Sequence, residues 1–598
     1  MKYIFTCDAT VVGASYYCHY EYEPVNGLDT YLDIRGFIQK NEKEWTQEYV
    51  HWHWSTLKKA GIKSHWSWIL GSSRMTSWFP SVLKALFFSV ALKKITTEKK
   101  LDEVYIVDAP KEVFSYIKEF VAEDTVSESR NAFKDLKKNK FKLRPFARKL
   151  KIYSKLFVRS LINRAAIEKQ TQKQDVLIYS HIINQKSLET TGDHFFGTLI
   201  NPKNNSFEFG VHWLFSIDQD GFANEMIVKN YLQSIQCNFT VLEDWIRPLD
   251  MIKSFLTLFW IRCFVFQLYK TIAPIEVGAE KSNLFARRFL DEFETTGGLT
   301  PLFELTLFYG LQAVLQKVQP KLIIYPYEEK GLEKAILLAT KKILPSAKTI
   351  AFTPALHNPG TLYLQDATQS VPEKPTSDFI GVTGSGARQW LHNHFRVSEN
   401  RIKVLGSPRH KNRFLISKVK KKNEKLKVLL IVGRGYELVA FAKAVKANLD
   451  ILQNCELLIR QNLTSWRADQ EKGLAILRSS EVSLIENKDG LVEQLQWADV
   501  ALFCSTSAGI EAMLMGRLTV YVDLNETFDL NPVSGKGDIS GLLYCSQVDQ
   551  LRSTLIQVTK MDEVELEKVI NRQIQFAEKI YAEPNFGSEI KKILKISI

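Results

Sequence analysis

A run of small hydroxyl-bearing residues follows an apolar strand pattern in the last fifth of this 598-residue chain. Ser505, Thr506 and Ser507 come directly after the apolar run 500–504, and an expected helix that contains Glu511 begins behind them. Hydroxyl groups and backbone N–H groups at the start of a helix attract anions. Beyond the carboxyl end of a strand in an open α/β sheet, that anion is usually a nucleotide phosphate. The alternative is an ordinary capped helix.

Carboxylates follow a second expected strand, 321–326. Glu328 and Glu329 lie at its end, and Glu333 lies one turn further on. A carboxylate on a strand-end loop beside apolar neighbours can have a raised pKa and act as a general base on a sugar hydroxyl group. The alternative is that these carboxylates stabilise a helix N-terminus.

Two further loops follow expected strands. His357 comes after the strand 349–352 and suits a phosphate or a developing charge near neutral pH, although a histidine before Asn-Pro-Gly is also an ordinary turn residue. Gly433 and Arg434 follow the strand 427–432, where the backbone can approach a diphosphate or form an ordinary strand-to-helix turn. Neither glycine turn matches a Walker A loop or GxGxxG, so the sequence gives no support for a kinase or a dehydrogenase. No paired-Asp motif is present, and we expect no metal ligands.

The elements that must position these residues alternate between strand and helix on both sides of a charged run. This alternation predicts an α/β fold, with two Rossmann-like domains facing a cleft. The expected parts are an N-terminal acceptor-side domain at 1–417 with a basic helical insertion at about 125–174, a linker at 418–425, a nucleotide-donor-binding domain at 426–565, and a C-terminal helix at 566–598 that packs back on the N-terminal domain.

Composition limits the protein class. A chain of 598 residues with 45% hydrophobic residues is long enough for more than one core. Its seven cysteines are scattered without the spacing of a zinc site or a disulfide framework, which favours a reducing cytoplasm. We expect neither a signal peptide nor a membrane-spanning segment.

The net charge of +13 is unevenly distributed. The segment 130–173 holds 15 Lys or Arg residues against Asp135 and Glu168, with apolar residues between them. This pattern is typical either of a helix on an anionic membrane surface or of a solvated helix face. The segment 251–270 is rich in Phe and Trp and fits an interfacial helix or a core helix. No nucleic-acid-binding motif accompanies the charge, so we expect no nucleic-acid partner.

Five segments together resemble GT-B glycosyltransferases, in particular a family of bacterial surface-carbohydrate (lipopolysaccharide or capsule) biosynthesis proteins. They are YPYEEKGLEKAILLATKKILPSAKTIAF from Tyr325, TPALHNPG from Thr353, SDFIGVTGSGARQWL from Ser377, KVLGSPRH from Lys403 and ADVALFCSTSAGIEAMLMGRLTVYV from Ala498. In this resemblance Glu328 and Glu333 line up with the two carboxylates of the first motif. The serine-rich turn looks like the phosphate-binding turn of sialyltransferase-like and polyol-phosphate-transferase-like enzymes.

The resemblance implies an inverting, metal-independent transfer from a nucleotide-activated sugar donor, often a CMP-linked nonulosonic acid, with no further cofactor. This chain departs from the pattern where such enzymes commonly carry a His-Pro pair, because Arg460 and Gln461 stand there. Arg460 can replace the contact of a histidine with phosphate, which leaves the donor nucleotide open. The loop of His357 also departs, because Ala355-Leu356 replaces the usual residues before the histidine.

These observations combine into one expected reaction. Glu328 or Glu329 deprotonates the acceptor hydroxyl group, and the Ser505–Ser507 turn holds the donor phosphate. The other expected roles are phosphate contact for His357, Gly433, Arg434 and Arg460, ribose contact for Glu511, and an acceptor-binding or structural role for Glu333 and Arg409.

The expected partners are a nucleotide sugar, a glycan or lipid-linked glycan acceptor, and an anionic membrane surface contacted through 130–173 and 251–270. The expected location is the cytoplasm, peripherally on the inner face of the cytoplasmic membrane. Two alternatives remain at this point: a polyol-phosphate transferase that uses a CDP-alditol, and a non-catalytic assembly protein that binds glycan or membrane.

Overall fold

The computed structural model describes most of the two expected domains and parts of the N-terminal third. The described residues are 2–6, 30–31, 34–59, 81–99, 103–107, 126–128, 153–161, 172–182, 192–202, 207–217, 225–282, 286, 300–328, 331–354, 375–410, 425–433, 435–447, 455–460, 467–479, 483–485, 490–524, 531–534, 542–545 and 550–595. The linker residues 418–424 and most of the basic insertion lie outside this set.

Seven parallel strands form the sheet of the N-terminal domain, in the order β13-β12-β11-β10-β5-β6-β7. Their bounds are β5 (Val176–Ile182), β6 (Val211–Ile217), β7 (Phe239–Val241), β10 (Leu322–Pro326), β11 (Lys348–Thr353), β12 (Phe379–Val382) and β13 (Ile402–Val404). All five residues of β10 are buried, as expected for a central parallel strand covered by helices on both faces.

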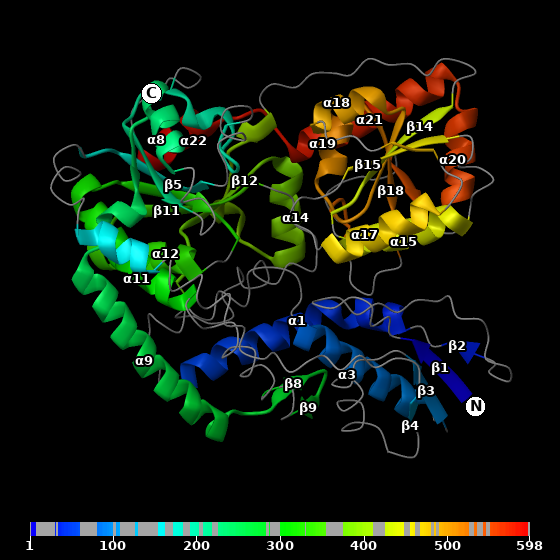
Figure 1. Ribbon diagram of the computed structural model, residues 1–598, viewed down its shortest axis with the longest axis horizontal. Coiled ribbons are helices and arrows are strands. Elements are labelled where there is room, and N and C mark those ends of the chain that lie inside the picture. The colour runs from blue at the N-terminus through cyan, green and yellow to red at the C-terminus, as the bar shows by residue number, and fades with distance from the viewer. Residues whose placement is uncertain are drawn as a thin grey trace.

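Helices cover both faces of this sheet (Figure 1). α11 (Thr300–Val318) and α12 (Gly331–Ile343) pack on one face, in a core that includes Tyr325 and Leu311. α8 (Glu225–Ser234) and α22 (Phe586–Leu594) pack on the other face, where Phe586 contacts Phe352. Burial of these apolar faces excludes water from both sides of the sheet and stabilises the layers.

Six parallel strands form the sheet of the C-terminal domain, in the order β16-β15-β14-β17-β18-β19. The strands are β14 (Leu426–Ile431), β15 (Cys455–Arg460), β16 (Ser483–Ile485), β17 (Val500–Phe503), β18 (Leu518–Val522) and β19 (Leu543–Cys545). The covering helices are α15 (Gly435–Ala447), α17 (Arg467–Arg478), α18 (Leu491–Trp497), α19 (Ala508–Leu514), α20 (Leu551–Lys560) and α21 (Glu563–Ile580). The predicted α/β fold with two Rossmann-like domains is confirmed.

Both sheets reverse their strand order at one point. In the N-terminal sheet the chain proceeds from β5 outward through β6 and β7, then returns to place β10 on the other side of β5. In the C-terminal sheet it proceeds from β14 to β15 and β16, then returns to place β17 beside β14. In open α/β sheets, ligands bind beyond the carboxyl ends of the strands at such switch points. The topology therefore predicts one ligand site at the carboxyl ends of β5 and β10 and another at the carboxyl ends of β14 and β17.

A third, smaller sheet lies outside the two domains (Figure 1), in the order β2-β1-β3-β4. It contains β1 (Lys2–Thr6), β2 (Thr30–Tyr31), β3 (Glu103–Val107) and β4 (Val126–Glu128), with the helices α1 (Ile34–Lys59) and α3 (Ser81–Lys99). The sequence predicted one Rossmann-like unit for 1–417, but β3 pairs in this separate sheet.

The hairpin β8 (Ile275–Val277) and β9 (Glu280–Ser282) joins the small unit to the rest of the chain. The Gly278 N–H donates to the Glu48 carboxylate at 2.6 Å, and the Trp52 indole N–H donates to the Ala273 carbonyl at 3.2 Å. Gly278 has φ +58, and a Cβ there would lie 2.8 Å from Nε1 of Trp45. The hairpin turn therefore requires glycine for its backbone conformation and for its close approach to α1.

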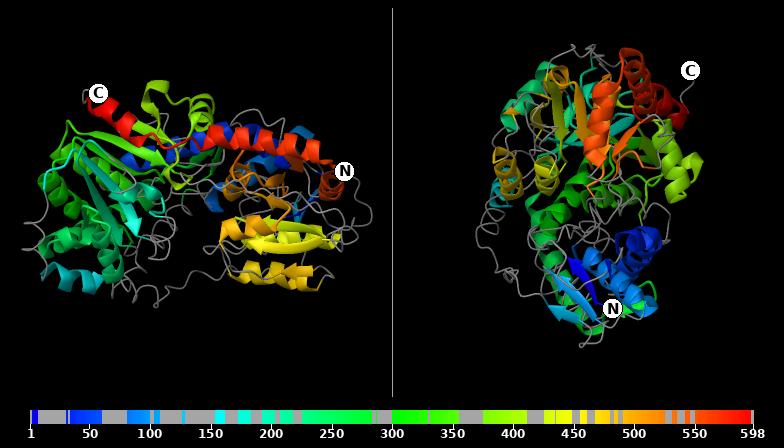
Figure 2. Two further views of the ribbon diagram at one scale, coloured as in Figure 1. Left: turned by 90° about the horizontal axis from the view of Figure 1, so that it is seen from above. Right: turned by 90° about the vertical axis from the view of Figure 1, so that its right-hand side faces the viewer.

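The chain crosses from the C-terminal domain back to the N-terminal domain after α21 (Figure 2). Ala582 donates its N–H to Thr383, and Ser407 donates its N–H to Ala582, both to carbonyl oxygens. A Cβ at Gly406 (φ +78) would lie 2.0 Å from the Glu583 carbonyl oxygen. Gly406 thus makes room for the crossing segment 581–585. Beyond this segment, Phe586 and Ile590 of α22 are buried on the N-terminal sheet.

Candidate active site

Three strands bring candidate residues together at the C-terminal switch point. Ile431 of β14 pairs with Arg460 of β15 and with Phe503 of β17. Because parallel strands end at the same edge, the turns that begin at Gly433 and Ser505 lie beside each other. A Cβ built on Gly433 would lie 3.1 Å from the Ser505 hydroxyl oxygen. Two loops that are far apart in the sequence therefore form one surface.

Glu437 joins these two turns. Its side chain, in the first turn of α15, is fully buried (0% exposed). One carboxylate oxygen accepts the Gly433 N–H at 2.6 Å, and the other accepts the Ser505 hydroxyl group. Hydrogen bonds to an ionised acceptor are among the stronger ones in proteins. The sequence reasoning missed Glu437, because an acidic residue at the start of a helix has an ordinary structural explanation.

These bonds assign different roles to the residues of the serine-rich turn. A serine hydroxyl group has one hydrogen to donate, and Ser505 donates it to Glu437. The N–H of Gly433 is likewise engaged. Thr506 accepts the Ala508 N–H at 3.3 Å through its hydroxyl oxygen, which leaves the hydroxyl hydrogen to donate elsewhere. Ser507 makes no side-chain cap hydrogen bond to α19. Gly433 and Ser505 therefore shape the turn, and the predicted phosphate contact of Ser505, Thr506 and Ser507 stays a prediction.

The helix behind the turn differs from the expectation. α19 spans only seven residues, and the N–H groups of Ile510 and Glu511 already donate to the Ser507 carbonyl oxygen. A helix this short has a weak macrodipole and few unused N–H groups. The short helix therefore contributes little to the anion site predicted at this edge, which leaves hydroxyl groups and cationic side chains as its main features.

Arg460 supplies one such cation. Its guanidinium group donates to the Gln494 side-chain oxygen at 2.9 Å. Burial lowers the pKa of Arg460, while the carboxylates of Glu511 and Glu493 raise it again. An arginine remains charged despite such a shift. Arg460 therefore places a fixed, partly buried positive charge at the end of β15.

Glu511 connects the two domains. Its carboxylate lies 3.6 Å from Nε2 of His410, which belongs to the N-terminal domain. Burial alone would raise the pKa of Glu511, but His410, Arg409 and Arg460 outweigh it and lower the pKa to about 2. His410 is also held by the Ser407 hydroxyl group at 2.7 Å and lies against the Tyr581 ring. The predicted ribose contact of Glu511 stays untested, and the structure gives its carboxylate an interdomain partner.

At the N-terminal switch point, Glu333 fixes the loop that carries Glu328. The buried Glu333 carboxylate (2% exposed) accepts the Glu328 N–H with both oxygens, at 2.9 and 3.1 Å. The Tyr327 N–H donates to the Phe352 carbonyl oxygen at 2.7 Å, which extends the β10–β11 ladder. Glu333 thus has a structural role, and Glu328 is the carboxylate placed at the end of β10.

Three polar side chains that the sequence reasoning did not single out lie on the neighbouring strands. His181, near the end of β5, contacts the Ser216 hydroxyl oxygen through Nδ1 at 2.8 Å. The Tyr179 hydroxyl group lies 2.6 Å from the same Ser216 oxygen. Burial raises the pKa of Tyr179, and the charges of Glu243, Glu333 and Glu328 raise it further. Because β5 and β10 are parallel neighbours, the His181 group and Glu328 lie at the same edge of the sheet. The sequence signal that could have identified this group is the polar His181 at the end of the buried strand β5.

Arg409 lies close enough to one buried carboxylate of each domain to lower its pKa. The buried Asp193 carboxylate accepts the Ser180 hydroxyl group at 2.7 Å and the Phe195 and Phe196 N–H groups at 2.9 Å. Burial raises the pKa of Asp193, and the exposed Arg409 guanidinium is among the groups that lower it. The same guanidinium lowers the pKa of Glu511. One cation thus acts on a carboxylate of each domain.

Other predicted residues lie outside the described part of the chain, namely Glu329, His357 and Arg434. Among the described residues, no group of three His, Cys, Asp or Glu side chains is placed to hold a metal ion.

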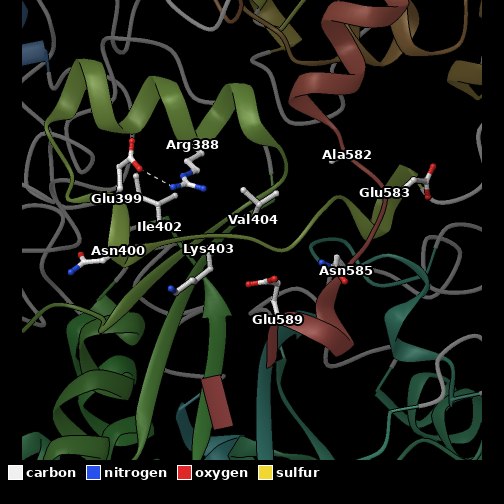
Figure 3. A pocket seen from close by; sticks show the side chains of 10 residues that line it. All are labelled: Arg388, Glu399, Asn400, Ile402, Lys403, Val404, Ala582, Glu583, Asn585 and Glu589. Carbon is white, nitrogen blue, oxygen red and sulfur yellow. Dashed lines mark hydrogen bonds and ion pairs between the residues drawn. The ribbon is translucent and has the colours of Figure 1, made fainter. Parts of the chain in front are cut away.

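A hollow of about 750 Å³ lies elsewhere, between β13, α14 (Ser385–Phe395) and the crossing segment (Figure 3). Arg388 and Glu399 form an ion pair at its rim, 2.9 Å apart. Its lining is Arg388, Glu399, Asn400, Ile402, Lys403, Val404, Ala582, Glu583, Asn585 and Glu589. None of these residues belongs to either switch point, so the hollow is separate from the candidate site.

Comparison with known proteins finds similarity in solved structures alone. No protein-family model and no curated protein matches the chain. It is similar to a UDP-GlcNAc 2-epimerase of Neisseria meningitidis bound to UDP-GlcNAc (12% identity, TM-score 0.41), to MurG of Acinetobacter baumannii (11%, 0.36) and to HepE of Anabaena in complex with UDP and glucose (10%, 0.40). Each match covers 71% of this chain and 100% of the other. Likeness at this level does not identify a donor or an acceptor.

Proposed function

We propose that the protein is a glycosyltransferase that moves a sugar from a nucleotide donor to a glycan acceptor. The observation that carries this proposal is a switch point in each domain, with Glu511 of the C-terminal domain paired to His410 of the N-terminal domain. One edge presents hydroxyl groups and Arg460, the other presents Glu328 and His181, and the charge of Arg409 acts on a carboxylate of each domain. The sequence resemblance to GT-B enzymes of bacterial surface-carbohydrate biosynthesis supports the same reaction class.

The donor binds at the C-terminal switch point. Thr506 and Ser507 donate hydroxyl hydrogen bonds to its phosphate, and Arg460 neutralises part of the phosphate charge. Glu437 holds the turn in the shape that this contact needs. A CMP-linked nonulosonic acid is the donor that we propose, because the serine-rich turn resembles that of sialyltransferase-like enzymes.

The acceptor hydroxyl group binds at the N-terminal switch point. Glu328 removes its proton as the oxygen attacks the anomeric carbon, and the nucleotide leaves with the bonding electron pair on its phosphate. Attack from the face opposite the leaving group inverts the anomeric centre. The positive charge of Arg460 stabilises the leaving phosphate, so we propose that the reaction needs no metal ion.

The acceptor is a surface polysaccharide precursor, free or linked to lipid, and the reaction takes place at the cytoplasmic face of the cytoplasmic membrane. Among the described residues, no helix has the length and apolar content needed to cross a bilayer. We propose that the association with the membrane is peripheral.

Transfer assays with CMP-, CDP-, UDP- and GDP-activated donors, each with and without EDTA, test the proposal. We expect turnover with a CMP-linked donor in the presence of EDTA, and loss of turnover in Glu328→Gln with nucleotide binding retained. Turnover with a CDP-alditol would instead identify a polyol-phosphate transferase. If no nucleotide binds while lipid vesicles do, the protein is a non-catalytic assembly protein and the proposal is wrong.

A further inference from the structure

The outward face of α9 (Pro248–Thr271) carries large apolar side chains. Six of them are between 51% and 63% exposed: Leu249, Ile252, Phe255, Leu256, Phe259 and Trp260. They recur at the three- and four-residue intervals that place side chains on one side of a helix. Figure 1 shows α9 on the outside of the molecule, running from the seven-stranded sheet toward the β8–β9 hairpin.

The opposite face of α9 fixes this orientation. Asp250, Met251, Ser254 and Leu258 are each 8% exposed or less. The Ser254 hydroxyl group donates to the Asp250 carbonyl oxygen at 2.7 Å. A surface helix of a globular protein normally turns its apolar side inward and its polar side to water. Among residues 248–260 of α9, whose side chains the structure describes, the polar Asp250 and Ser254 lie inward, and Phe255, Phe259 and Trp260 lie outward.

A second helix, 153–161, extends the same apolar surface. The Tyr153 hydroxyl group donates to the Met251 carbonyl oxygen at 2.9 Å, which places the start of this helix beside the first turn of α9. Phe157, Val158 and Leu161 of this helix are 40%, 55% and 63% exposed. We call the nine exposed apolar side chains of the two helices the docking face.

Most of the exposed large hydrophobic side chains of the described residues lie on the docking face. The described part of the chain exposes thirteen large hydrophobic side chains, and nine of them belong to the docking face. Single exposed apolar residues are normal on soluble proteins, whereas a contiguous group marks a binding surface.

Charge on the two helices is positive where it meets water. Lys155 and Lys253 are exposed, and Arg159 is turned inward to an ion pair with Asp244. The one carboxylate in the sequence of either helix, Asp250, is buried. Aromatic and aliphatic side chains beside lysines, without an exposed carboxylate, match the boundary between lipid headgroups and acyl chains. Protein–protein interfaces are depleted in lysine, which disfavours a second copy of this chain as the occupant.

We propose that the docking face binds the surface of an anionic lipid bilayer, with its apolar side chains at the acyl boundary and Lys155 and Lys253 among the headgroups. α9 then lies in the plane of the membrane and holds the N-terminal domain at the surface. This inference deepens the peripheral location proposed above, where a lipid-linked acceptor would be met. Its test reads lipid binding and is independent of sugar transfer.

Vesicle co-sedimentation of the full-length protein tests the docking face. We expect binding to phosphatidylcholine vesicles that contain phosphatidylglycerol, and binding at least about tenfold weaker in the double variant Phe259→Gln, Trp260→Gln. Val564→Gln is the matched control, because Val564 is 75% exposed on α21, away from the docking face. The variant Lys155→Gln, Lys253→Gln should lose much of the preference for anionic over neutral vesicles. Since all five substituted side chains are exposed, the melting temperature of each variant should remain close to that of the wild type.

Three results would overturn the inference. The first is failure of the wild type to bind anionic vesicles, and the second is equal binding by the Phe259, Trp260 double variant and the Val564 control. The third is a concentration-dependent dimer, seen by light scattering, that Trp260→Gln dissolves while vesicle binding is absent, which would assign the face to a second copy. Intact vesicle binding without sugar transfer from any donor would leave the docking face standing and refute the proposed function.

Discussion

Replacement of Glu437 by leucine removes the buried carboxylate that joins the Gly433 and Ser505 turns. Leucine keeps the apolar volume but accepts no hydrogen bond, so the Gly433 N–H and the Ser505 hydroxyl group lose their shared partner. Glu437→Gln is the matched control. Its amide oxygen can accept the Gly433 N–H, while its amide nitrogen donates to the Ser505 oxygen, because a hydroxyl group can rotate and accept.

The magnitude follows from the two hydrogen bonds. Each bond to an ionised group contributes about 1.5–3 kcal/mol, so their gross loss in Glu437→Leu is about 3–6 kcal/mol. The carboxylate also costs desolvation energy at a fully buried site (0% exposed), which offsets part of this loss. We expect a net local destabilisation of about 2–4 kcal/mol in Glu437→Leu. For Glu437→Gln we expect less than about 1 kcal/mol.

Hydrogen exchange followed by mass spectrometry measures the local destabilisation of the two turns. A local measurement is needed because a two-domain chain need not unfold in one step. A loss of 2–4 kcal/mol corresponds to about 30- to 900-fold faster exchange in peptides that contain Gly433 and 505–510. Glu437→Gln should change exchange less than about fivefold. Nucleotide affinity should also fall more in Glu437→Leu than in Glu437→Gln.

Unchanged exchange in both peptides of Glu437→Leu would show that the carboxylate does not hold the turns together. Equal effects of leucine and glutamine would refute the reversal of the Ser505 hydroxyl group. Faster exchange in Glu437→Leu with unchanged nucleotide affinity would show that the turn does not bind the donor.

The remaining predictions concern the interdomain pair and the acceptor edge. Glu511 has a pKa lowered from 4.5 to about 2 in the folded protein. Its contribution is therefore complete above pH 4.5 and is lost as pH falls toward 2, with about 3 kcal/mol at pH 7 and about 1.4 kcal/mol at pH 3. The stability difference between wild type and Glu511→Gln should shrink accordingly in denaturant titrations, and a difference independent of pH would contradict this. Glu333→Gln should weaken turnover less than Glu328→Gln in the transfer assay, and the opposite ranking would make Glu333 the reacting carboxylate. His181→Ala should lower kcat by about 10²-fold or more with donor affinity unchanged, and unaltered kcat would exclude acid–base work by His181.

The two domains could be predicted from the sequence because central parallel strands are continuous apolar runs. The runs at Leu322–Pro326 and Val500–Phe503 are buried along their whole length, and each is followed by polar residues. Strand order could not be predicted in the same way. It depends on pairing between distant segments, such as β10 with β5, and that pairing creates the switch points.

The residues that the sequence reasoning missed share one property, which is a partner far away in the chain. Glu437 and Ser505 are 68 residues apart, and His181 and Ser216 are 35 apart. Their local patterns are those of an ordinary helix start and an ordinary strand end. For α9 the sequence left an interfacial helix and a core helix both open, because periodicity shows that a helix has an apolar side but not which neighbour covers it.

Calorimetric titration of CMP, CDP, UDP and GDP into the wild type and two variants tests the donor site most directly. The variants are Arg460→Gln and the double variant Thr506→Ala, Ser507→Ala. We predict that a cytidine nucleotide binds the wild type and that each variant binds it at least about tenfold more weakly. Equal binding by all three proteins, or binding of none of the four nucleotides, would contradict a donor phosphate site at the C-terminal switch point.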